Sequence, residues 1–357
     1  MKHIALVAGA RPNFMKVAPL RAALAARGAR ITFIHTGQHY DPLMSDVFFR
    51  DLGLPAPDVH LGVGPGDRIV QSKAIVEVLV PILKTQAPDV LVVVGDVTST
   101  AAAAMAGVLA GVPVAHVEAG LRSFHWPMPE ELNRMIADHH SRWLFVTEPS
   151  GVANLHAERI PDERVHLVGN VMIDTLRRLE PQAAESGVLA RLGLTPGGYG
   201  VLTLHRPENV DDPESFRALA ETLAKTAERL PLVYPVHHRV RDRLEGTALA
   251  AAPGVRIIEP LGYVDMLALV RAAKAVVTDS GGLQEETTAL GVPCLTLRGQ
   301  TERPITVDVG TSEIVGHDPA VISAAVERVL AGTWKKGRVP ELWDGHAAER
   351  IADILLK

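Results

Sequence analysis

The feature that most constrains the fold is an alternation along the chain. Short apolar runs rich in Val and Ile are each followed by a longer segment in which apolar residues recur at helical spacing. Short, continuously apolar runs of this kind are typical of strands buried on both faces. Strands that alternate with helices form parallel sheets covered by helices on both faces. The sequence therefore predicts an α/β fold.

The alternation runs through the chain twice. In the first half the expected strands are 4–7, 31–35, 90–94, 114–117 and 143–146, and the expected helices are 15–27, 69–86, 100–110, 130–140 and 150–160. After Gly169 the expected strands are 201–204, 232–236, 255–258, 275–278 and 294–297, and the expected helices are 216–229 and 283–290. A last helix is expected at about 346–355.

Chain length supports two domains. The 357 residues exceed what one hydrophobic core usually organises. With the hinge near 168–180, the first domain is expected to comprise residues 1–170 and the C-terminal helix within 346–357, and the second residues 171–345. A ligand is expected between two such domains.

Charge and cysteine content narrow the partners and the compartment. The net charge of −5 gives no basic field for nucleic acid or for an acidic membrane surface. No apolar run reaches the roughly 18 residues of a membrane span, and the N-terminal apolar run is too short for a signal peptide. The one cysteine, Cys294, fits a reducing compartment. We therefore expect a cytoplasmic protein that acts on a small ligand.

Charged residues follow the first expected strand. Gly9 permits a tight strand-to-helix turn, Pro12 suits a helix start, and Arg11 and Lys16 are placed to hold an anion such as a phosphate. The turn is neither a dinucleotide fingerprint nor a P-loop, because the required glycines are missing. Alternatively, both cations lie on an ordinary helix surface.

Three carboxylates follow successive strands of the first domain. Asp96, Glu118 and Glu130 are expected at the same edge of one sheet, where proximity suits them to general acid and base work. Asp96 has an alternative interpretation as a helix N-cap, and Glu131 as a first-turn glutamate stabilised by the helix dipole. His116 does not fall into any set with the spacing of a metal site, so no metal is expected.

The second domain presents two further strand ends. His205 follows one strand, where it either faces a substrate or caps a loop. Another strand ends in Ser280, Gly281 and Gly282 before a helix, a turn whose backbone N–H groups suit a diphosphate. Glu286, one turn into that helix, is placed to accept hydrogen bonds from ribose hydroxyls.

These segments belong to a longer series that runs in order through nearly the whole chain. The series is Gly9-Ala10-Arg11-Pro12-Asn13-Phe14-Met15-Lys16 with Ala18-Pro19-Leu20, Gly37-Gln38-His39, Gly95-Asp96, His116-Val117-Glu118-Ala119-Gly120-Leu121-Arg122, Pro129-Glu130-Glu131-x-Asn133-Arg134, Leu204-His205-Arg206, Tyr234-Pro235-Val236-His237, Asp279-Ser280-Gly281-Gly282-x-Gln284-Glu285-Glu286 and Thr301-Glu302-Arg303-Pro304. The set resembles the non-hydrolysing UDP-N-acetylglucosamine 2-epimerases.

The resemblance implies a fold of two Rossmann-like domains that face each other across a cleft, as in GT-B glycosyltransferases, with the C-terminal helix crossing back to the first domain. It also implies a homodimer, a UDP-sugar substrate, no nicotinamide or metal cofactor, and a place in polysaccharide biosynthesis. In this family UDP is eliminated to leave a 2-acetamidoglucal, and it is added back after C2 has been reprotonated on its other face.

The resemblance also assigns roles to individual positions. Asp96, Glu118, Glu130 and His205 match the family's catalytic residues, and the carboxylates are the candidates for moving the C2 proton, with the division between acid and base left open. The matching substrate-binding positions are Arg11, Lys16, Ser280, Gly281, Gly282, Glu286 and Arg303. The positions that match a second, activating UDP-sugar site are Gln38, Arg68, Arg206 and His237.

The chain departs from the family pattern at a few positions. Many members have Glu at position 13, where this chain has Asn, and Arg-Pro-Glu in place of Arg303-Pro304-Ile305; Asp41 stands where Gln is frequent. Related enzymes that act on UDP-linked diacetamido uronic acids share much of the series, so the substituents at C3 and C6 of the sugar stay open. A GT-B glycosyltransferase, a hydrolysing epimerase and a UDP-sugar sensor are the further alternatives.

Overall fold

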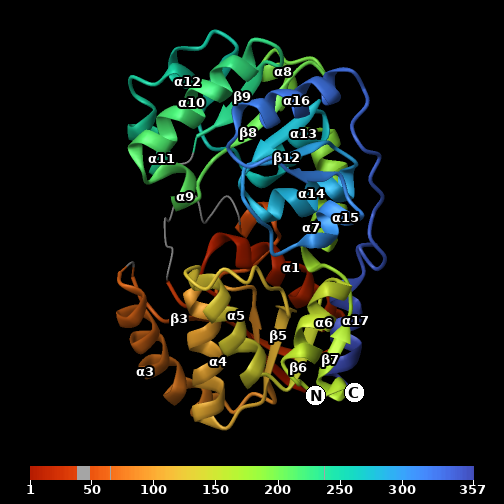
Figure 1. The fold of residues 1–357 in the computed structure, drawn as a ribbon. Helices are drawn as coiled ribbons and strands as arrows, with labels where there is room; N and C mark the ends of the chain where they lie inside the picture. The colour runs from red at the N-terminus through yellow and green to blue at the C-terminus, as the bar shows by residue number, and fades with distance from the viewer. Residues whose placement is uncertain (38–48, 65, 237) are drawn as a thin grey trace. The chain divides into compact units, whose positions relative to one another are not determined.

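The structure is a computed structural model that describes residues 1–37, 49–64, 66–236 and 238–357. Figure 1 shows its two α/β units. Unit 1 comprises Met1–Arg178 and Glu341–Lys357, and unit 2 comprises Leu179–Pro340. The first division lies within helix α7 (Val171–Ala184), whereas the sequence placed it after residue 170.

Unit 1 is built on a parallel sheet. Its strands are β1 (His3–Ala8), β2 (Arg30–His35), β3 (Val59–His60), β4 (Val90–Val94), β5 (Val114–Ala119), β6 (Trp143–Val146) and β7 (Val165–Leu167). Within the described residues their order is β3-β2-β1-β4-β5-β6-β7. All pairs are parallel. This order is that of a Rossmann sheet with one strand added at the end.

The sheet of unit 1 is flanked by helices. They are α1 (Arg11–Ala26), α3 (Arg68–Gln86), α4 (Thr98–Ala110), α5 (Pro129–His140), α6 (Pro149–Ala157), the start of α7, and α17 (Ala347–Leu355), with a short 3-10 turn at Asp162–Arg164. Helices α3, α4 and α5 pack side by side, and α1 packs against α17 (Figure 1). The central strands β1 and β4 are buried along their whole length, as their apolar runs predict.

The C-terminal segment is tied to unit 1 by three contacts. The buried Asp174 carboxylate accepts hydrogen bonds from Ala347 N at 3.1 Å and Ala348 N at 2.6 Å, so it caps α17 from α7. The indole N–H of Trp343 donates to Thr147 O at 3.0 Å. The two bonds to Asp174 satisfy backbone N–H groups at the start of α17 that have no partner within the helix. Together the three contacts confirm the expectation that the last helix returns to the first domain.

Unit 2 repeats the Rossmann order. Its strands are β8 (Gly200–Thr203), β9 (Leu232–Pro235), β10 (Val255–Ile258), β11 (Ala275–Thr278), β12 (Cys294–Thr296) and β13 (Ser312–Ile314), in the order β10-β9-β8-β11-β12-β13. Its helices are α8 (Val188–Arg191), α9 (Pro207–Val210), α10 (Pro213–Ala227), α11 (His238–Leu244), α12 (Ala248–Ala251), α13 (Tyr263–Arg271), α14 (Gly281–Leu290), α15 (Pro304–Asp308) and α16 (Pro319–Leu330).

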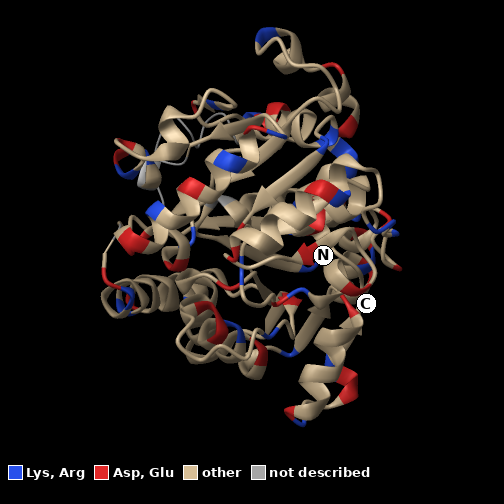
Figure 2. Ribbon diagram, turned by 45° about the horizontal axis from the view of Figure 1, so that its top comes forward, with Lys and Arg blue, Asp and Glu red and all other residues tan. Residues whose placement is uncertain are grey.

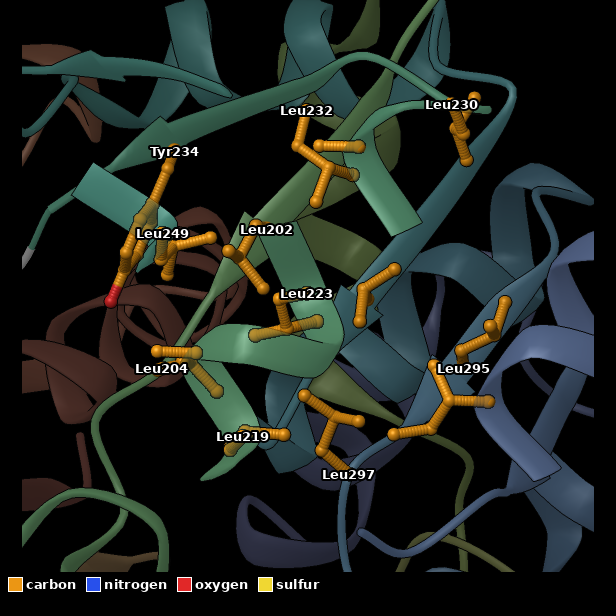
Figure 3. Close-up of a cluster of buried hydrophobic side chains, with 14 of the residues drawn as sticks. Leu202, Leu204, Leu219, Leu223, Leu230, Leu232, Tyr234, Leu249, Leu295 and Leu297 are labelled. Carbon is orange, nitrogen blue, oxygen red and sulfur yellow. The ribbon is translucent and has the colours of Figure 1, made fainter. Parts of the chain in front are cut away.

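A leucine-rich core fills one face of the second sheet. Leu202 and Leu204 from the β8 segment meet Leu219 and Leu223 of α10, with Leu295 from β12 in the same cluster (Figure 3). Each of these side chains is at most 4% exposed. Burying a leucine side chain contributes roughly 1.5 to 3 kcal/mol, so this cluster fixes the sheet whose strand ends carry the polar residues described below.

The predicted fold class is confirmed, and every expected strand and helix is present with ends shifted by a few residues. Helix α1 begins at Arg11, earlier than expected, because Pro12 is compatible with a first helical turn. Lys and Arg residues are interspersed with Asp and Glu in both units (Figure 2). Among the described residues, no helix combines the length and the apolar character that a membrane crossing requires.

Candidate active site

The strand order of each unit defines where a ligand is expected. In unit 1 the order reverses between β1 and β4, and in unit 2 between β8 and β11. Ligands of open parallel sheets bind at the carboxyl ends of the strands beside such a switch point. The candidate residues follow β1, β4 and β5 in unit 1 and β8 and β11 in unit 2.

Asn13 joins the first two strand ends of unit 1. Its Oδ1 accepts hydrogen bonds from Gly9 N and Ala10 N, both at 3.1 Å, and its Nδ2 donates to Val94 O at 3.1 Å. Asn13 therefore orders the turn after β1 against the end of β4. Arg11 is the first residue of α1, but its side chain lies outside the described part of the structure.

Lys16 and Glu118 form a buried ion pair beside this turn. Glu118 has φ 74, and the register between β5 and β6 shifts at the same place. A left-handed backbone is costly for a residue with a side chain, and a bulge re-aims that side chain. The end of β5 is thus distorted in a way that directs Glu118 at Lys16.

Gly95 makes room for the pair. It has φ 68, and a Cβ at this position would lie 2.9 Å from Lys16 Nζ and 3.8 Å from Glu118 Oε2. Both the backbone conformation and the close approach require glycine. The turn after β4 therefore passes directly against the ion pair.

Asp96, the residue after Gly95, is held by helix α5. Asn133 Nδ2 donates to Asp96 O at 2.8 Å, and Arg134 Nη2 lies 3.7 Å from Asp96 Oδ2. The alternative interpretation of Asp96 as an N-cap is wrong, because Val97 occupies the N-cap position of α4. The Asp96 side chain is 22% exposed, so the carboxylate is accessible from the strand edge.

Glu130 and Glu131 begin α5 but differ in environment. Glu130 is half-buried in the first turn of the helix. Glu131 is buried and accepts hydrogen bonds from Ser123 N at 2.9 Å and Phe124 N at 3.0 Å, so it orders the loop that follows β5. Of the two residues, Glu130 is the less buried.

The buried His116 of β5 connects the turn after β4 to helix α5. His116 Nε2 lies 2.7 Å from Gly95 O and Nδ1 lies 2.7 Å from Asp138 Oδ1, so both ring nitrogens face acceptors. Burial alone would raise the pKa of Asp138, but His116 and Arg122 hold this pKa below its usual value. Both ring nitrogens of His116 are therefore engaged within unit 1.

In unit 2, the carboxylate of Asp279 organises the turn after β8. It accepts hydrogen bonds from the backbone N–H groups of His205 and Arg206, each at 2.9 Å, and from His205 Nδ1, at 2.8 Å. The His205 side chain is 43% exposed, whereas that of Asp279 is 0% exposed. The sequence pattern predicted a role for His205 but none for Asp279.

The turn between β11 and α14 has the geometry of an anion site. Ser280 is the N-cap of α14, and its Oγ accepts a hydrogen bond from Leu283 N at 3.4 Å. Gly281 and Gly282 follow as the first two residues of the helix, where backbone N–H groups have no intrahelical acceptor. Such N–H groups and the helix dipole favour a bound phosphate.

Arg303 lies beneath this turn. Its Nε donates to Glu285 Oε1 at 2.8 Å, and its Nη1 pairs with Glu302. A Cβ at Gly281 would lie 2.5 Å from Arg303 Nη1, so the glycine lets the guanidinium pack against the helix start. Arg303, which was predicted to bind substrate, is buried and ion-paired at this turn.

Glu302 also connects Arg303 to a position predicted for an activating site. Arg206 Nη2 lies 3.4 Å from Glu302 Oε1, and Arg298 Nη1 donates to Glu302 Oε2 at 2.8 Å. Arg206 therefore belongs to the same charge network as Arg303 in unit 2. Arg68 is exposed at the start of α3 in unit 1, while Gln38 and His237 lie outside the described residues.

Glu286 is buried one turn into α14. Its Oε1 accepts a hydrogen bond from Tyr263 Oη at 3.0 Å. Burial raises the pKa of Glu286 to about 7, with Glu285 adding to the rise and the Tyr263 hydrogen bond opposing it. Tyr263 thus hydrogen-bonds to one carboxyl oxygen of Glu286, the residue predicted to bind the ribose.

Comparisons with known proteins place this architecture in one family. The UDP-N-acetylglucosamine 2-epimerase family matches residues 22–356. The UDP-N-acetylglucosamine 2-epimerase of Methanocaldococcus jannaschii is 37% identical, with 99% of this chain and 98% of that protein covered. The UDP-2,3-diacetamido-2,3-dideoxy-D-glucuronate 2-epimerase of Pseudomonas aeruginosa is 34% identical, with 100% of both chains covered.

The fold agrees equally well. The crystal structure of the Methanocaldococcus jannaschii UDP-GlcNAc 2-epimerase in complex with UDP-GlcNAc and UDP superposes with a TM-score of 0.91 at 36% identity, covering 100% of this chain and 99% of that one. Two Rossmann-type units with acidic strand ends in one and a Ser-Gly-Gly turn in the other define a nucleotide-sugar enzyme. The chain belongs to the UDP-N-acetylglucosamine 2-epimerase family, and it is therefore an isomerase.

Proposed function

We propose that the protein interconverts UDP-N-acetylglucosamine and UDP-N-acetylmannosamine by inverting C2 of the sugar. Full-length similarity to a UDP-N-acetylglucosamine 2-epimerase supports the reaction. The observation that carries it here is that the chain has both kinds of strand end: carboxylates at the ends of β4 and β5 in unit 1, and a helix N-terminus with adjacent glycines after β11 in unit 2.

The proposed route is elimination followed by addition. A C2 hydrogen beside an acetamido group is very weakly acidic, so its removal needs a departing anion. UDP leaves from C1 with the electrons of the C1–O bond as a carboxylate takes the C2 proton, and the product is a 2-acetamidoglucal. A proton then returns to the opposite face of C2, and UDP adds back to C1.

Asp96, Glu118 and Glu130 are the proposed proton-transfer groups. Lys16 pairs with Glu118 and favours its ionised form, which is the form that a base requires. Asp96 and Glu130 keep more accessible carboxyl groups. Lys16 and Arg11 are proposed to interact with the diphosphate as it leaves.

In unit 2, the turn at Ser280, Gly281 and Gly282 is proposed to bind the diphosphate, and Glu286 to bind the ribose. Two first-turn N–H groups supply donors to an anion. The second carboxyl oxygen of Glu286 is placed to accept from a hydroxyl, since Tyr263 holds the first. His205 is proposed to act on the leaving group, and Arg303 to support the turn from beneath.

A comparison also supports one alternative substrate, a UDP-linked diacetamido uronic acid. The Pseudomonas aeruginosa relative named for a UDP-diacetamido uronic acid is nearly as similar as the others. The two substrates differ at C3 and C6, whereas the bonds that break and form are at C1 and C2. Parallel assays with both sugars decide between them, because the correct substrate is expected to give the higher kcat/KM.

We further propose that the enzyme is a cytoplasmic homodimer that needs no metal or nicotinamide, and that a second UDP-sugar binds at Gln38, Arg68, Arg206 and His237. Sedimentation of the pure protein tests the dimer, because a monomeric mass at assay concentration contradicts it. A hyperbolic dependence of rate on UDP-N-acetylglucosamine, with no activation by added substrate, would contradict the second site.

The reaction itself is tested by proton NMR. Incubation of the pure protein with UDP-N-acetylglucosamine alone, in EDTA, is expected to produce the anomeric signal of the manno epimer until equilibrium is reached. Release of free N-acetylmannosamine would identify a hydrolysing enzyme instead. Absence of any reaction until an acceptor is added would identify a glycosyltransferase.

A further inference from the structure

The carboxylate of Asp279 distributes its hydrogen bonds unequally between its two oxygens. Oδ2 accepts from His205 N at 2.9 Å, Arg206 N at 2.9 Å and Asn209 Nδ2 at 3.0 Å. Oδ1 lies 2.8 Å from His205 Nδ1 and 3.2 Å from His205 N. One oxygen therefore holds the turn, and the other faces the histidine ring.

This arrangement determines which nitrogen of His205 carries the proton in the neutral ring. Burial alone would raise the pKa of Asp279, but His205 and the two backbone N–H groups hold this pKa below its usual value, so the group is a carboxylate at neutral pH. A carboxylate is an acceptor only. Nδ1 of His205 must therefore be the donor, and Nε2 presents its lone pair when the ring is neutral.

We infer that Asp279 is a positioning residue for the proposed reaction, because it fixes the tautomer and the orientation of His205. The inference rests on the proposed function only for the step in which His205 acts. Nε2 is the ring atom left to meet substrate, at the carboxyl end of β8. It accepts a proton when the ring is neutral and donates one when the ring is protonated, while Nδ1–H stays bound to Asp279.

The unequal hydrogen bonding makes a specific prediction for Asp279→Asn. The amide oxygen is expected at the Oδ2 position, since three N–H groups converge there and an amide nitrogen would face all three as a second donor. The NH2 group then takes the Oδ1 position and donates to His205 Nδ1. The neutral ring must carry its proton on Nε2, which becomes a donor where an acceptor was present.

The experiment reads the tautomer directly. The full-length protein is labelled with ring-15N histidine, His205 is assigned from the resonances lost in His205→Gln, and long-range 1H–15N spectra are recorded at a pH where the ring is neutral. We expect a protonated Nδ1 in the unsubstituted enzyme and a protonated Nε2 in Asp279→Asn, together with a fall in kcat of roughly tenfold or more.

Asn209→Ala is the matched control. Asn209 Nδ2 donates both to Asp279 Oδ2 and to Leu297 O at 3.1 Å, so its removal weakens the same turn without touching the His205 ring. This variant is expected to keep the Nδ1-protonated tautomer. If Asn209→Ala also lost that tautomer, the turn as a whole, and not Asp279, would fix the tautomer of His205. This result would overturn the inference.

The tautomer readout separates this inference from the proposed function. An unchanged His205 spectrum in Asp279→Asn overturns the inference, whatever the enzyme's substrate. A reversed tautomer with unchanged kcat also overturns it, because His205 would then not depend on Asp279 for its role. A reversed tautomer in a protein that does not epimerise UDP-N-acetylglucosamine supports the positioning role and contradicts the proposed function.

Discussion

The two units share a strand order but differ in the chemistry at their strand ends. In unit 1, a carboxylate on a bulged strand is paired with a buried lysine beside Gly95. In unit 2, the corresponding edge carries a helix N-terminus with two glycines and a glutamate whose pKa is raised to about 7 by burial. The same scaffold thus favours an ionised carboxylate in one unit and anion binding in the other.

The difference arises from local departures from regular structure. The bulge and the positive φ of Glu118 are a departure in a strand, which redirects one side chain. At the start of α14, Gly281 has no Cβ, and the Arg303 guanidinium can therefore lie against the helix backbone. The account therefore predicts that changes at the unit 1 carboxylates alter turnover, whereas changes at the Ser280-Gly281-Gly282 turn and at Glu286 of unit 2 alter nucleotide affinity.

Glu118→Gln should have the largest effect. The substitution keeps the shape of the side chain but removes the carboxylate, so we expect turnover to fall by roughly 10²-fold or more while UDP affinity changes little. Steady-state kinetics and calorimetry with UDP measure the two quantities. Glu158→Gln, which removes a carboxylate paired with Arg122 at 2.7 Å in the same unit, should leave turnover nearly unchanged. If Glu118→Gln turned over normally, Asp96 or Glu130 would be the group that moves the C2 proton.

Gly281→Val tests the other half of the comparison. A Cβ at this position meets the Arg303 guanidinium, so either this buried, ion-paired side chain or the helix start must shift, and both changes disturb the turn. UDP affinity is expected to weaken by about tenfold to a hundredfold, which corresponds to the loss of one or two hydrogen bonds to a charged ligand. Gly299→Ala is the control, since its Cβ would meet nothing within 4 Å. Calorimetry that found equal UDP affinity for both variants would exclude this turn as the diphosphate site.

Glu286→Gln should act on stability and binding in opposite directions. The pKa of Glu286 is raised from 4.5 to about 7, so the folded protein binds more protons than the unfolded chain between these values. The ligand-free protein should therefore lose stability as pH rises through this window, on the order of 3 kcal/mol by linkage. The variant should be more stable than the parent at pH 8, similar near pH 4.5, and weaker in UDP binding. If the melting temperatures of parent and variant changed with pH in the same way across this range, Glu286 would not be a buried group that ionises in it.

Asp174→Ala should give the smallest effect, confined to unit 1. The carboxylate caps α17 through two backbone N–H groups, so its loss should lower the free energy of unfolding by about 1 to 3 kcal/mol. Urea unfolding measures this loss, and UDP affinity is expected to stay within twofold. An equal loss of UDP affinity would mean that the two units do not divide the work as described.

The sequence predicted the sheets better than their edges. Buried apolar runs such as that of β4 identify strands without ambiguity, because both faces of the sheet are covered. The edge strands β3, β7 and β13 were missed, since two or three residues carry no readable period. Helices α7 and α16 were also missed, although both are amphipathic, because no strand-to-helix motif drew attention to them.

The candidate site was predictable as a set of strand ends but not as a set of contacts. Each of four candidates lies within two residues of the end of a strand, which the alternation reveals: Asp96, Glu118, His205 and Ser280. Asp279 was not recognised, because its partners in the turn after β8 lie some 70 residues away in sequence. The burial of Arg303 between two glutamates likewise depends on packing that spacing does not encode.

The central claim is that C2 of the sugar loses its proton and regains one on the other face. Conversion of UDP-N-acetylglucosamine in D2O, followed by proton NMR and mass spectrometry of the product, tests it most directly. The account predicts that the epimer carries one solvent deuterium at C2, because the group that returns the proton has exchanged with water. An epimer that retains the original hydrogen at C2 would contradict it.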